Sequence, residues 1–295
     1  MKEDKKDIFS KKKKKKMSKK LKGIIITSIL AFSTVALWQG LTVKMYTVSS
    51  DKLTAPMRIM ALTDLHSTIY GDKQKNLIKQ IREYNPDVIV LVGDIAVDDV
   101  PHKGTELLLS AIGREYPCYY VTGNHEFMSG EAAYIKEMIG SYGVTILEGN
   151  STIIEVGGQK IRIAGVDDPE GFDGYKYYKD EITAEWREQF DNCSKENGDE
   201  IYSVLLSHRP ELTDIYKNSS FDLVIAGHAH GGQVRIPGLV NGLYAPNQGL
   251  FPKYAGGLYE LGNTTMVVSR GLCRNLIPRV FNRPEIVVID LLPLE

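Results

Sequence analysis

The sequence is poor in cysteine, and it contains neither an internal repeat nor a low-complexity segment apart from one lysine-rich stretch. Its three cysteines, Cys118, Cys193 and Cys273, are an odd and scattered set without metal-type spacing. No disulfide framework is therefore expected to hold the fold together. An Arg-Arg pair is also missing before the first apolar segment, so nothing indicates twin-arginine export.

Positive charge is scarce beyond the first residues of the chain. The formal net charge of the 295 residues is −1, but residues 1–22 carry twelve lysines against three acidic residues, a net charge of +9. The remaining residues therefore carry −10, with 24 basic and 34 acidic side chains. Binding to long nucleic acids requires a basic surface that displaces counterions from phosphates. The acidic body argues against a long nucleic acid as a partner.

The lysine-rich stretch is followed directly by the apolar residues 23–43, which contain no charge. A helix of this length rises about 1.5 Å per residue and can cross a hydrocarbon core of about 30 Å. Lysine-rich flanks of a membrane-crossing helix remain in the cytoplasm, so the part of the chain after the helix is expected outside the cytoplasm. In chain order we expect a basic cytoplasmic tail (1–22), a single-pass transmembrane signal anchor (23–43), a linker (44–56) and an extracytoplasmic domain (57–295). A cleaved signal peptide is the alternative, although its best cleavage site, Thr34-Val35-Ala36, lies inside the apolar stretch.

Short apolar runs alternate with amphipathic segments from residue 57 onward. The first half predicts strands that run into loops, separated by helices; the strands cover 57–66, 86–94 and 117–126, and the helices 73–84, 105–116 and 131–143. After residue 144 short strands dominate, with Gly157-Gly158 as a hairpin turn and one helix around 181–191. Further strands are expected at 201–208, 222–226 and the C-terminus. The pattern predicts an α/β domain with a mixed two-sheet core and outer helices.

Polar residues that bind metals follow five of the predicted strands. They occur in the segments Asp64-Leu65-His66, Gly93-Asp94, Gly123-Asn124-His125-Glu126, Ser207-His208 and Gly227-His228-Ala229-His230. Each segment alone is a weak signal, since a lone histidine is usually a hydrogen-bonded core or surface residue. Ligand crevices of open α/β sheets lie at the carboxyl ends of strands, so the five segments are expected to converge.

The residue types at these strand ends match the needs of two divalent metal ions about 3.5–4 Å apart. Such a pair requires a bridging carboxylate, neutral imidazoles and oxygen ligands. Seven candidates supply this chemistry: Asp64, His66, Asp94, Asn124, His208, His228 and His230. Mixed His, Asp and Asn ligands tolerate Mn, Fe or Zn, so the sequence does not identify the ions.

The segments DLH, GD, GNHE, a later H and GHAHGGQ, in this order, resemble the calcineurin-like metallophosphoesterase superfamily over residues 57–290. The resemblance implies a four-layer αββα sandwich with two mixed β-sheets between layers of helices. It also implies that Asp64, His66 and His230 bind one ion, that Asn124, His208 and His228 bind the other, and that Asp94 bridges them. By the same resemblance, a metal-activated hydroxide attacks phosphorus and His125 protonates the leaving oxygen.

The segments after GHAHGGQ, together with the N-terminal anchor, resemble the membrane-associated branch that includes UDP-2,3-diacylglucosamine pyrophosphatase-type enzymes. This branch implies a phosphodiester or phosphoanhydride in a lipid-linked or envelope substrate. Arg270 and Arg274 are candidate substrate-binding residues, although structural packing is the alternative. Two other functions remain open: a phosphodiesterase for cyclic nucleotides or other small molecules, and a non-catalytic interaction module on the same fold.

Overall fold

The computed structural model describes residues 18–96, 101–172, 182–195, 200–274 and 277–294. The chain divides into two units, Met1–Ala36 and Leu37–Glu295. In the first unit, the described part is the helix α1 (Lys19–Ala36), and the second unit contains the β-sheets and the remaining described helices. Most of the expected basic tail, residues 1–17, lies outside the described residues.

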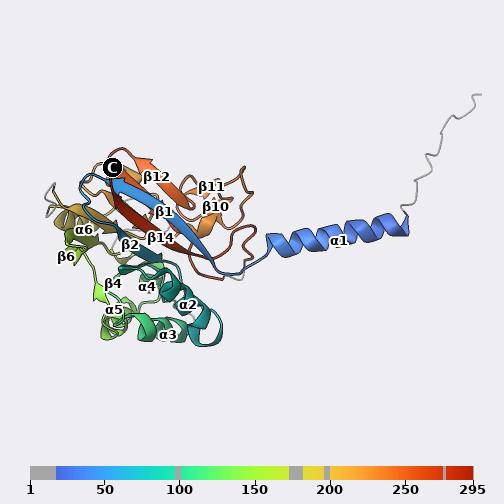
Figure 1. Cartoon of the computed structure of the whole chain (residues 1–295), viewed down its shortest axis with the longest axis horizontal. Coiled ribbons are helices and arrows are strands. Elements are labelled where there is room, and N and C mark those ends of the chain that lie inside the picture. Colours follow the sequence, from blue (N-terminus) through green and yellow to red (C-terminus); the bar gives the residue numbers. More distant parts are fainter. Residues whose placement is uncertain (1–17, 97–100, 173–181, 196–199, 275–276, 295) are drawn as a thin grey trace, which may run out of the picture. The chain divides into compact units, whose positions relative to one another are not determined.

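The first sheet has six strands, with β1 and β14 side by side at one edge (Figure 1). Strands β2 to β5 are parallel, whereas β14 is antiparallel to β2 and parallel to β1. In spatial order the strands are β1 (Thr42–Ser50), β14 (Glu285–Pro293), β2 (Met57–Leu62), β3 (Val88–Val92), β4 (Cys118–Val121) and β5 (Thr145–Ile146).

The second sheet also has six strands and is also mixed. Its central strands are parallel, and the strands at its two edges are antiparallel to their neighbours. In spatial order they are β12 (Gly257–Leu261), β13 (Thr264–Val268), β9 (Leu223–Ala226), β8 (Tyr202–Leu206), β7 (Gln159–Gly165) and β6 (Asn150–Val156). A short separate hairpin consists of β10 (Tyr244–Ala245) and β11 (Gly249–Leu250).

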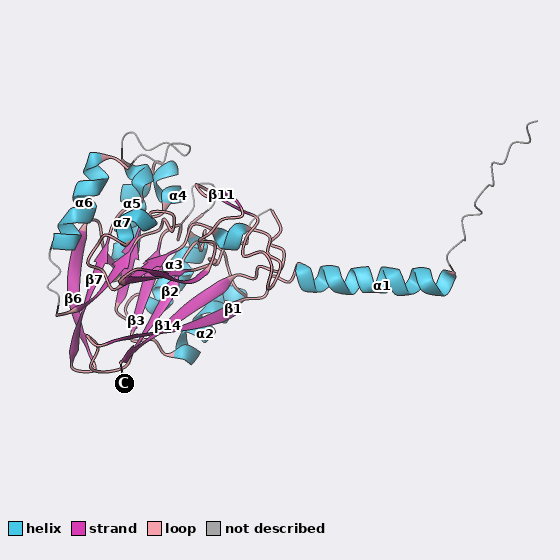
Figure 2. Ribbon diagram, turned by 90° about the horizontal axis from the view of Figure 1, so that it is seen from above, coloured by secondary structure: helices cyan, strands magenta, loops and turns pink. Residues whose placement is uncertain are grey.

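Three apolar clusters hold the layers together. Because side chains alternate along a strand, Val88 and Val90 of β3 point into the cluster between the two sheets, whereas Ile89 and Leu91 point into a second cluster with the helices. That second cluster includes residues of α2 (Lys75–Tyr84), α3 (Lys103–Ile112) and α5 (Ala132–Ser141). The third joins the second sheet to α6 (Ala184–Lys195) and α7 (Thr213–Tyr216). The helices and strands of these layers are distinguished by colour in Figure 2. The expected arrangement of two mixed sheets with outer helices is confirmed.

Most elements of the body lie where the sequence predicts them. The turn Gly157-Gly158 joins β6 to β7, and both glycines have positive φ angles, 61° and 79°, as a tight hairpin of this kind requires. The sequence did not predict the short helix α4 (Asn124–Met128) or the single turns η1 (Asp72–Gln74), η2 (Pro169–Gly171) and η3 (His230–Gly232).

The structure differs from the expected anchor and linker. Helix α1 begins at Lys19 and ends at Ala36, so residues 37–43 are not part of a membrane-crossing helix. The expected linker 44–56 is wrong over its first half, because β1 (Thr42–Ser50) pairs with β14 along its whole length. Leu41 and Val43 pack against the second apolar cluster, between the first sheet and its helices, and this packing accounts for their apolar character. Among the helices of the described residues, none combines the length and the apolar character needed to cross a bilayer.

Candidate metal centre

The candidate ligands follow strands that end at one edge of the two sheets. Asp64, Asp94 and Asn124 follow β2, β3 and β4 of the first sheet, and His208 and His228 follow β8 and β9 of the second. Within each sheet these strands are parallel, so their carboxyl ends lie together. Glycines allow the close approach: a Cβ atom at Gly93 would collide with the ring of His208, and one at Gly123 with the carboxylate of Asp94.

The backbone at the centre is held in an unusual conformation. Positive φ angles occur at five candidate ligands, namely Asp64 (48°), His66 (47°), Asp94 (54°), His228 (64°) and His230 (45°). Non-glycine residues adopt such angles at a cost of about 1–3 kcal/mol each, and they do so mainly where a site requires it. The backbone at these five residues is therefore less stable locally, and this conformation directs their side chains to the site.

The structure brings six of the seven candidate ligands into two groups of possible metal-binding atoms. One group comprises Asp64, His66, Asp94 and His230, and the other comprises Asp94, His208 and His228; within each, the ligand atoms lie within 4.8 Å of one another. Asp94 is common to both groups. The seventh candidate, Asn124, lines the same pocket as Asp94, His228 and His230.

Hydrogen bonds fix the rings of two histidines in the second group. The Nδ1 atom of His208 lies 2.9 Å from the carbonyl oxygen of Val92, which leaves Nε2 facing Asp94 Oδ2 at 3.2 Å. The ring of His228 has the opposite orientation, because its Nε2 atom lies 3.0 Å from Asn247 Oδ1 and 3.0 Å from Arg209 Nη1. A partner on one ring nitrogen sets which nitrogen remains for a metal ion.

Buried charges of opposite sign face each other in the candidate centre. Burial lowers the pKa of His208, but the carboxylate of Asp94 outweighs this effect and raises that pKa to about 10. Burial likewise opposes, and Cys273 and Asp64 together produce, the rise in the pKa of His230 to about 10. By contrast, burial dominates at His66 and lowers its pKa to about 3. The positively charged forms of His208 and His230 are therefore favoured beside the carboxylates of Asp94 and Asp64.

The residues present fit divalent ions. Five buried side-chain atoms of the candidate ligands, namely Asp64 Oδ2, His66 Nε2, Asp94 Oδ2, Asn124 Oδ1 and His208 Nε2, have no hydrogen-bond partner among the described residues apart from the ion-pair contact of 3.2 Å between His208 Nε2 and Asp94 Oδ2. A buried polar atom without a partner costs about 1–3 kcal/mol. All five are oxygen or nitrogen atoms of the types that bind Mn, Fe or Zn. Metal ions would satisfy atoms that the protein alone leaves unsatisfied.

A pocket of about 180 Å³ opens onto this centre. Its lining includes Asp94, Asn124, His125, Met128 and Pro246, besides the two histidines that follow β9. His125 is at the start of α4, where its backbone N–H donates to Asp94 Oδ1 at 2.9 Å, and its ring lies edge-on to that of His66 at 4.7 Å between centroids. The ring of His125 is thus positioned beside the pocket and next to the candidate ligands.

Glu126 is a structural residue of the site to which the sequence pattern assigns no role. Its buried carboxylate accepts hydrogen bonds from the backbone N–H groups of Asp94, Ile95, Ala96 and Gly123 at 2.7–3.1 Å. It therefore fastens the loop after β3 to the start of α4. Burial raises the pKa of Glu126 to about 7, against the four donors that favour its charged form. Its position directly after Asn124-His125 was the available signal.

Arg270 and Arg274 do not line the pocket. Arg270 donates from its backbone and from Nε to the buried carboxylate of Glu285, at 2.9 and 2.6 Å. Arg274 stacks over the ring of Tyr70, 4.4 Å from its centroid, and donates to the carbonyl oxygen of Gln39 at 3.2 Å. Both guanidinium groups thus have structural contacts, and their binding of substrate stays a prediction.

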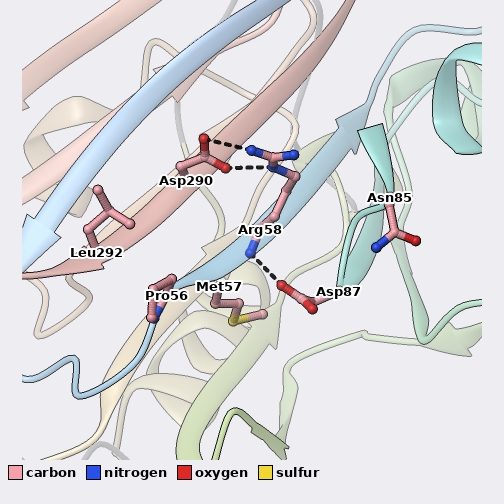
Figure 3. A pocket seen from close by; sticks show the side chains of 7 residues that line it. All are labelled: Pro56, Met57, Arg58, Asn85, Asp87, Asp290 and Leu292. Carbon is pink, nitrogen blue, oxygen red and sulfur yellow. Dashed lines mark hydrogen bonds and ion pairs between the residues drawn. The ribbon is translucent and has the colours of Figure 1, made fainter. Parts of the chain in front are cut away.

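A larger hollow, of about 350 Å³, lies at the opposite end of β2 (Figure 3). It is lined by Arg58, Asp87 and Asp290 among others, and the Arg58 guanidinium makes a two-point ion pair with Asp290 at 2.7 and 3.0 Å. Asp87 accepts the backbone N–H of Arg58 at 2.7 Å. Arg58, Asp87 and Asp290 are thus paired with one another, and the candidate metal ligands lie at the other end of the strand.

Comparison with known proteins agrees with this placement. A profile of the family described as "Calcineurin-like phosphoesterase" matches residues 57–232, which is more than half of the chain. The chain is similar to an uncharacterized metallophosphoesterase of Bacillus subtilis, YkuE, with 28% identity over 79% of this chain and 78% of that protein. It is also similar to the phosphodiesterase YaeI of Escherichia coli, with 26% identity over 80% of this chain and 83% of that protein. A transmembrane protein with a metallophosphoesterase domain from Danio rerio is 27% identical over 91% of this chain and 61% of that protein.

The match includes the segments from Asp64 to His230, which form the His/Asp cluster. The family consists of hydrolases of phosphoric esters that use two divalent metal ions, and the cluster is able to bind such ions. With the sequence segments, the two-sheet fold and the geometry of the site in agreement, the chain belongs to the calcineurin-like phosphoesterase family.

Proposed function

We propose that the chain hydrolyses a phosphodiester or phosphoanhydride bond in an amphiphilic, lipid-linked substrate at two divalent metal ions. The observation that carries the proposal is the convergence of ligand atoms from both sheets in two groups that share Asp94, beside one pocket. When bound, two such ions polarise a phosphoryl oxygen and lower the pKa of coordinated water. The protein supplies the geometry that holds them and the side chains around the substrate.

The ligands divide between the two ions as the residue groups suggest. Asp64, His66 and His230 would hold one ion, and His208, His228 and Asn124 the other. Asp94 would bridge them, which is supported by its membership of both groups of ligand atoms. The opposite orientations of His208 and His228 allow a Nε2 atom and a Nδ1 atom to face the same ion.

His125 would supply the proton that the leaving oxygen needs. It lines the pocket, and the contact between its backbone and Asp94 ties its position to the bridging carboxylate. A histidine so placed can donate a proton to a leaving oxygen, which is the role that imidazole most often plays in general acid catalysis.

An apolar surface beside the pocket supports a lipid-linked substrate. The β10–β11 hairpin reaches the metal centre through Pro246, which lines the pocket, and Asn247, which contacts His228. The same hairpin and its flanks expose large apolar side chains to solvent: Leu243 (38%), Tyr244 (49%), Leu250 (68%) and Phe251 (67%). A substrate with a phosphate head and an apolar tail would place the head at the ions and the tail on this surface. The resemblance to UDP-2,3-diacylglucosamine pyrophosphatase-type enzymes belongs to the same proposal.

We further propose that the N-terminal segment attaches the protein to the cell membrane, with the catalytic domain outside the cytoplasm. Helix α1 exposes Ile24, Ile26, Ile29, Leu30 and Phe32, and these residues come directly after the lysine-rich residues 1–22. A relative from Danio rerio is named as a transmembrane protein.

Fractionation of cells tests the attachment to the membrane, and protease treatment of intact cells or spheroplasts tests the side on which the catalytic domain lies. Recovery of the protein in the soluble fraction, or its protection in spheroplasts, would contradict the proposal.

The enzymatic proposal is tested with the full chain, stripped of metal and reloaded with Mn²⁺, Zn²⁺ or Fe²⁺. Hydrolysis of a chromogenic phosphodiester, a phosphomonoester and a lipid-linked diphosphate is compared. We expect metal-dependent turnover with the diester or diphosphate preferred, and a loss of at least about 100-fold in Asp94→Asn, since bridging is lost.

Asp214→Asn, at an exposed ion pair with Lys217, is the matched control. Metal-independent turnover, or equal turnover in Asp94→Asn, would refute the dimetal mechanism. A preference for soluble diesters over the lipid-linked substrate would contradict the substrate class alone.

A further inference from the structure

Most of the large apolar side chains that the body exposes come from three segments of the chain. Among the described residues of the second unit, fifteen such side chains are exposed, and nine of them lie in residues 37–41, 232–251 and 277–283. Besides the four on the β10–β11 hairpin and its flanks, they are Leu37, Trp38, Ile236, Leu239 and Ile277. Exposed apolar side chains scattered singly are ordinary, whereas a gathered set marks a site of interaction.

Hydrogen bonds hold these three segments side by side. The backbone N–H of Arg235 donates to the carbonyl oxygen of Val280 at 2.9 Å, which joins the second segment to the third. The Nε atom of Arg283 donates to the carbonyl oxygen of Gly40 at 2.8 Å, which joins the third segment to the first. The three segments thus form one continuous part of the surface, and we call their nine exposed side chains the apolar face.

The same part of the chain is basic, although the body is acidic. Residues 232–283 contain six arginines and lysines and one acidic residue, a net charge of +5, against −10 for residues 23–295 as a whole. Two of the six are held inside the fold, since Arg270 pairs with the buried carboxylate of Glu285 and Arg279 is only 1% exposed. The other four make no ion pair with a carboxylate among the residues that the structure describes: Arg235, Lys253, Arg274 and Arg283.

The chain enters its body at the apolar face. The body begins at Leu37, directly after the apolar N-terminal segment that is proposed to attach the protein to the membrane. A bilayer that holds this segment lies within a few residues of the face, and Trp38 is of the residue type that favours the headgroup region. Pro246, in the β10–β11 hairpin, lines the pocket at the metal centre, so the face also borders the candidate site. A lipid bilayer is thus the partner that the N-terminal segment itself would bring to this face.

We propose that the apolar face docks on the surface of an anionic lipid bilayer, with its apolar side chains at the boundary of headgroups and acyl chains and the four basic side chains near lipid phosphates. The inference rests on the proposed attachment by the N-terminal segment and goes beyond it, since it gives the catalytic body a membrane contact of its own. Apolar area buried at the interface and attraction of lysine and arginine to anionic lipids both strengthen such binding. The pocket at the metal centre then lies beside the lipid headgroups.

The test measures how deeply single side chains of the full chain lie in lipid. The protein is bound to nanodiscs that contain phosphatidylglycerol, and one nitroxide label at a time is attached at Leu239→Cys, Leu250→Cys or Ile277→Cys. The native cysteines do not interfere, because all three are buried. Collisions of the label with O₂, which enters lipid, are compared with collisions with a nickel chelate, which stays in water. We expect O₂ to dominate at all three positions, at a depth of about 5–10 Å into the boundary of headgroups and acyl chains.

Two further labels separate docking of the body from attachment of the N-terminal segment. Ile153→Cys is the matched control, because Ile153 is exposed but lies on β6, outside the three segments, and its label should stay in water. Ser28→Cys in α1 reports the attachment. Labels of the apolar face in water, with the Ser28→Cys label in lipid, would overturn the inference and leave the attachment intact, whereas all labels in water would refute both. Equal depth in discs of phosphatidylcholine alone would overturn the role of the basic side chains, and dipolar broadening between Leu239→Cys labels would show that a second copy of the chain covers the face instead.

Discussion

Arg209 and Asp168 form a buried two-point ion pair beside His228. The Nε and Nη2 atoms of Arg209 donate to the two carboxylate oxygens of Asp168 at 2.6 and 2.7 Å. The third nitrogen, Nη1, lies 3.0 Å from His228 Nε2 and 2.8 Å from Asn247 Oδ1. Neither residue of the pair is more than 1% exposed. The guanidinium thus connects the turn after β7 to a candidate ligand of the second ion.

Replacement of this arginine should weaken both the fold and the metal site. Arg209→Lys keeps the charge but cannot make the two-point contact, so we expect a loss of about 3–5 kcal/mol in the free energy of unfolding. The affinity for one ion should fall by about 10–100-fold, because His228 loses its support. Denaturant unfolding and Mn²⁺ titration measure the two effects. Arg82→Lys, at the exposed pair with Glu115, should change neither, and equal stability of both variants would contradict the role of the buried pair.

Substitution of His125 should affect substrates according to their leaving groups. In His125→Gln we expect a fall in kcat of about 10²–10⁴-fold for an alkyl phosphodiester, whose leaving oxygen requires a proton. A p-nitrophenyl diester should lose much less, because p-nitrophenolate leaves without protonation. The metal content of the variant should equal that of the wild type. An equal loss for both substrates would indicate that His125 orients the substrate and does not act as an acid.

Metal binding should release protons and become tighter as the pH rises. In the metal-free protein the pKa of His208 and that of His230 are both raised to about 10, so both rings are protonated at neutral pH. A cation must displace these protons, and the apparent affinity for Mn²⁺ should therefore increase from about pH 6 to about pH 9. Calorimetric titrations in two buffers with different ionisation enthalpies give the number of protons released. An affinity independent of pH would show that neither histidine binds an ion.

The apolar hairpin should matter only for substrates with a lipid tail. We expect Leu250→Ser and Phe251→Ser to lower kcat/KM for a lipid-linked diphosphate in detergent micelles by about 10–100-fold each, from the loss of about 1.5–3 kcal/mol of apolar contact with the lipid tail. Turnover of a soluble chromogenic diester should remain unchanged. Ile153→Ser is a control, since Ile153 is also exposed but lies on β6. A loss shared by both substrates would place the hairpin in the catalytic machinery instead.

The candidate site was predictable because its signals are local. Each of Asp64, Asp94, Asn124, His208 and His228 follows a short apolar run, and parallel strands bring such positions together wherever the rest of the fold places them. The hairpin at Gly157-Gly158 was local in the same way. These features can be predicted from neighbouring residues alone, without the identity of their distant contacts.

Contacts between segments far apart in the sequence were not predictable. Cys273 meets His230 across 43 positions, and Arg209 meets Asp168 across 41, through loops whose composition gives no sign of either contact. Likewise, the expected boundary between the apolar segment 23–43 and the linker 44–56 lies inside β1, because nothing in the residues 42–50 themselves marks them as a strand. Their pairing with β14, more than 200 residues later in the chain, makes them one.

The nine-residue pairing of β1 with β14 has a consequence for trimming of the chain. A protease that cuts before Thr42 leaves the sheet whole, whereas a cut near Ser49 removes its outermost strand. The apolar strand β14, of which five consecutive residues from Glu285 to Ile289 are buried, would then become the edge, with unpaired backbone groups available to a second molecule. A shortened recombinant protein that starts after β1 should therefore self-associate, and residues 37–41 mark the latest start at which the body remains closed.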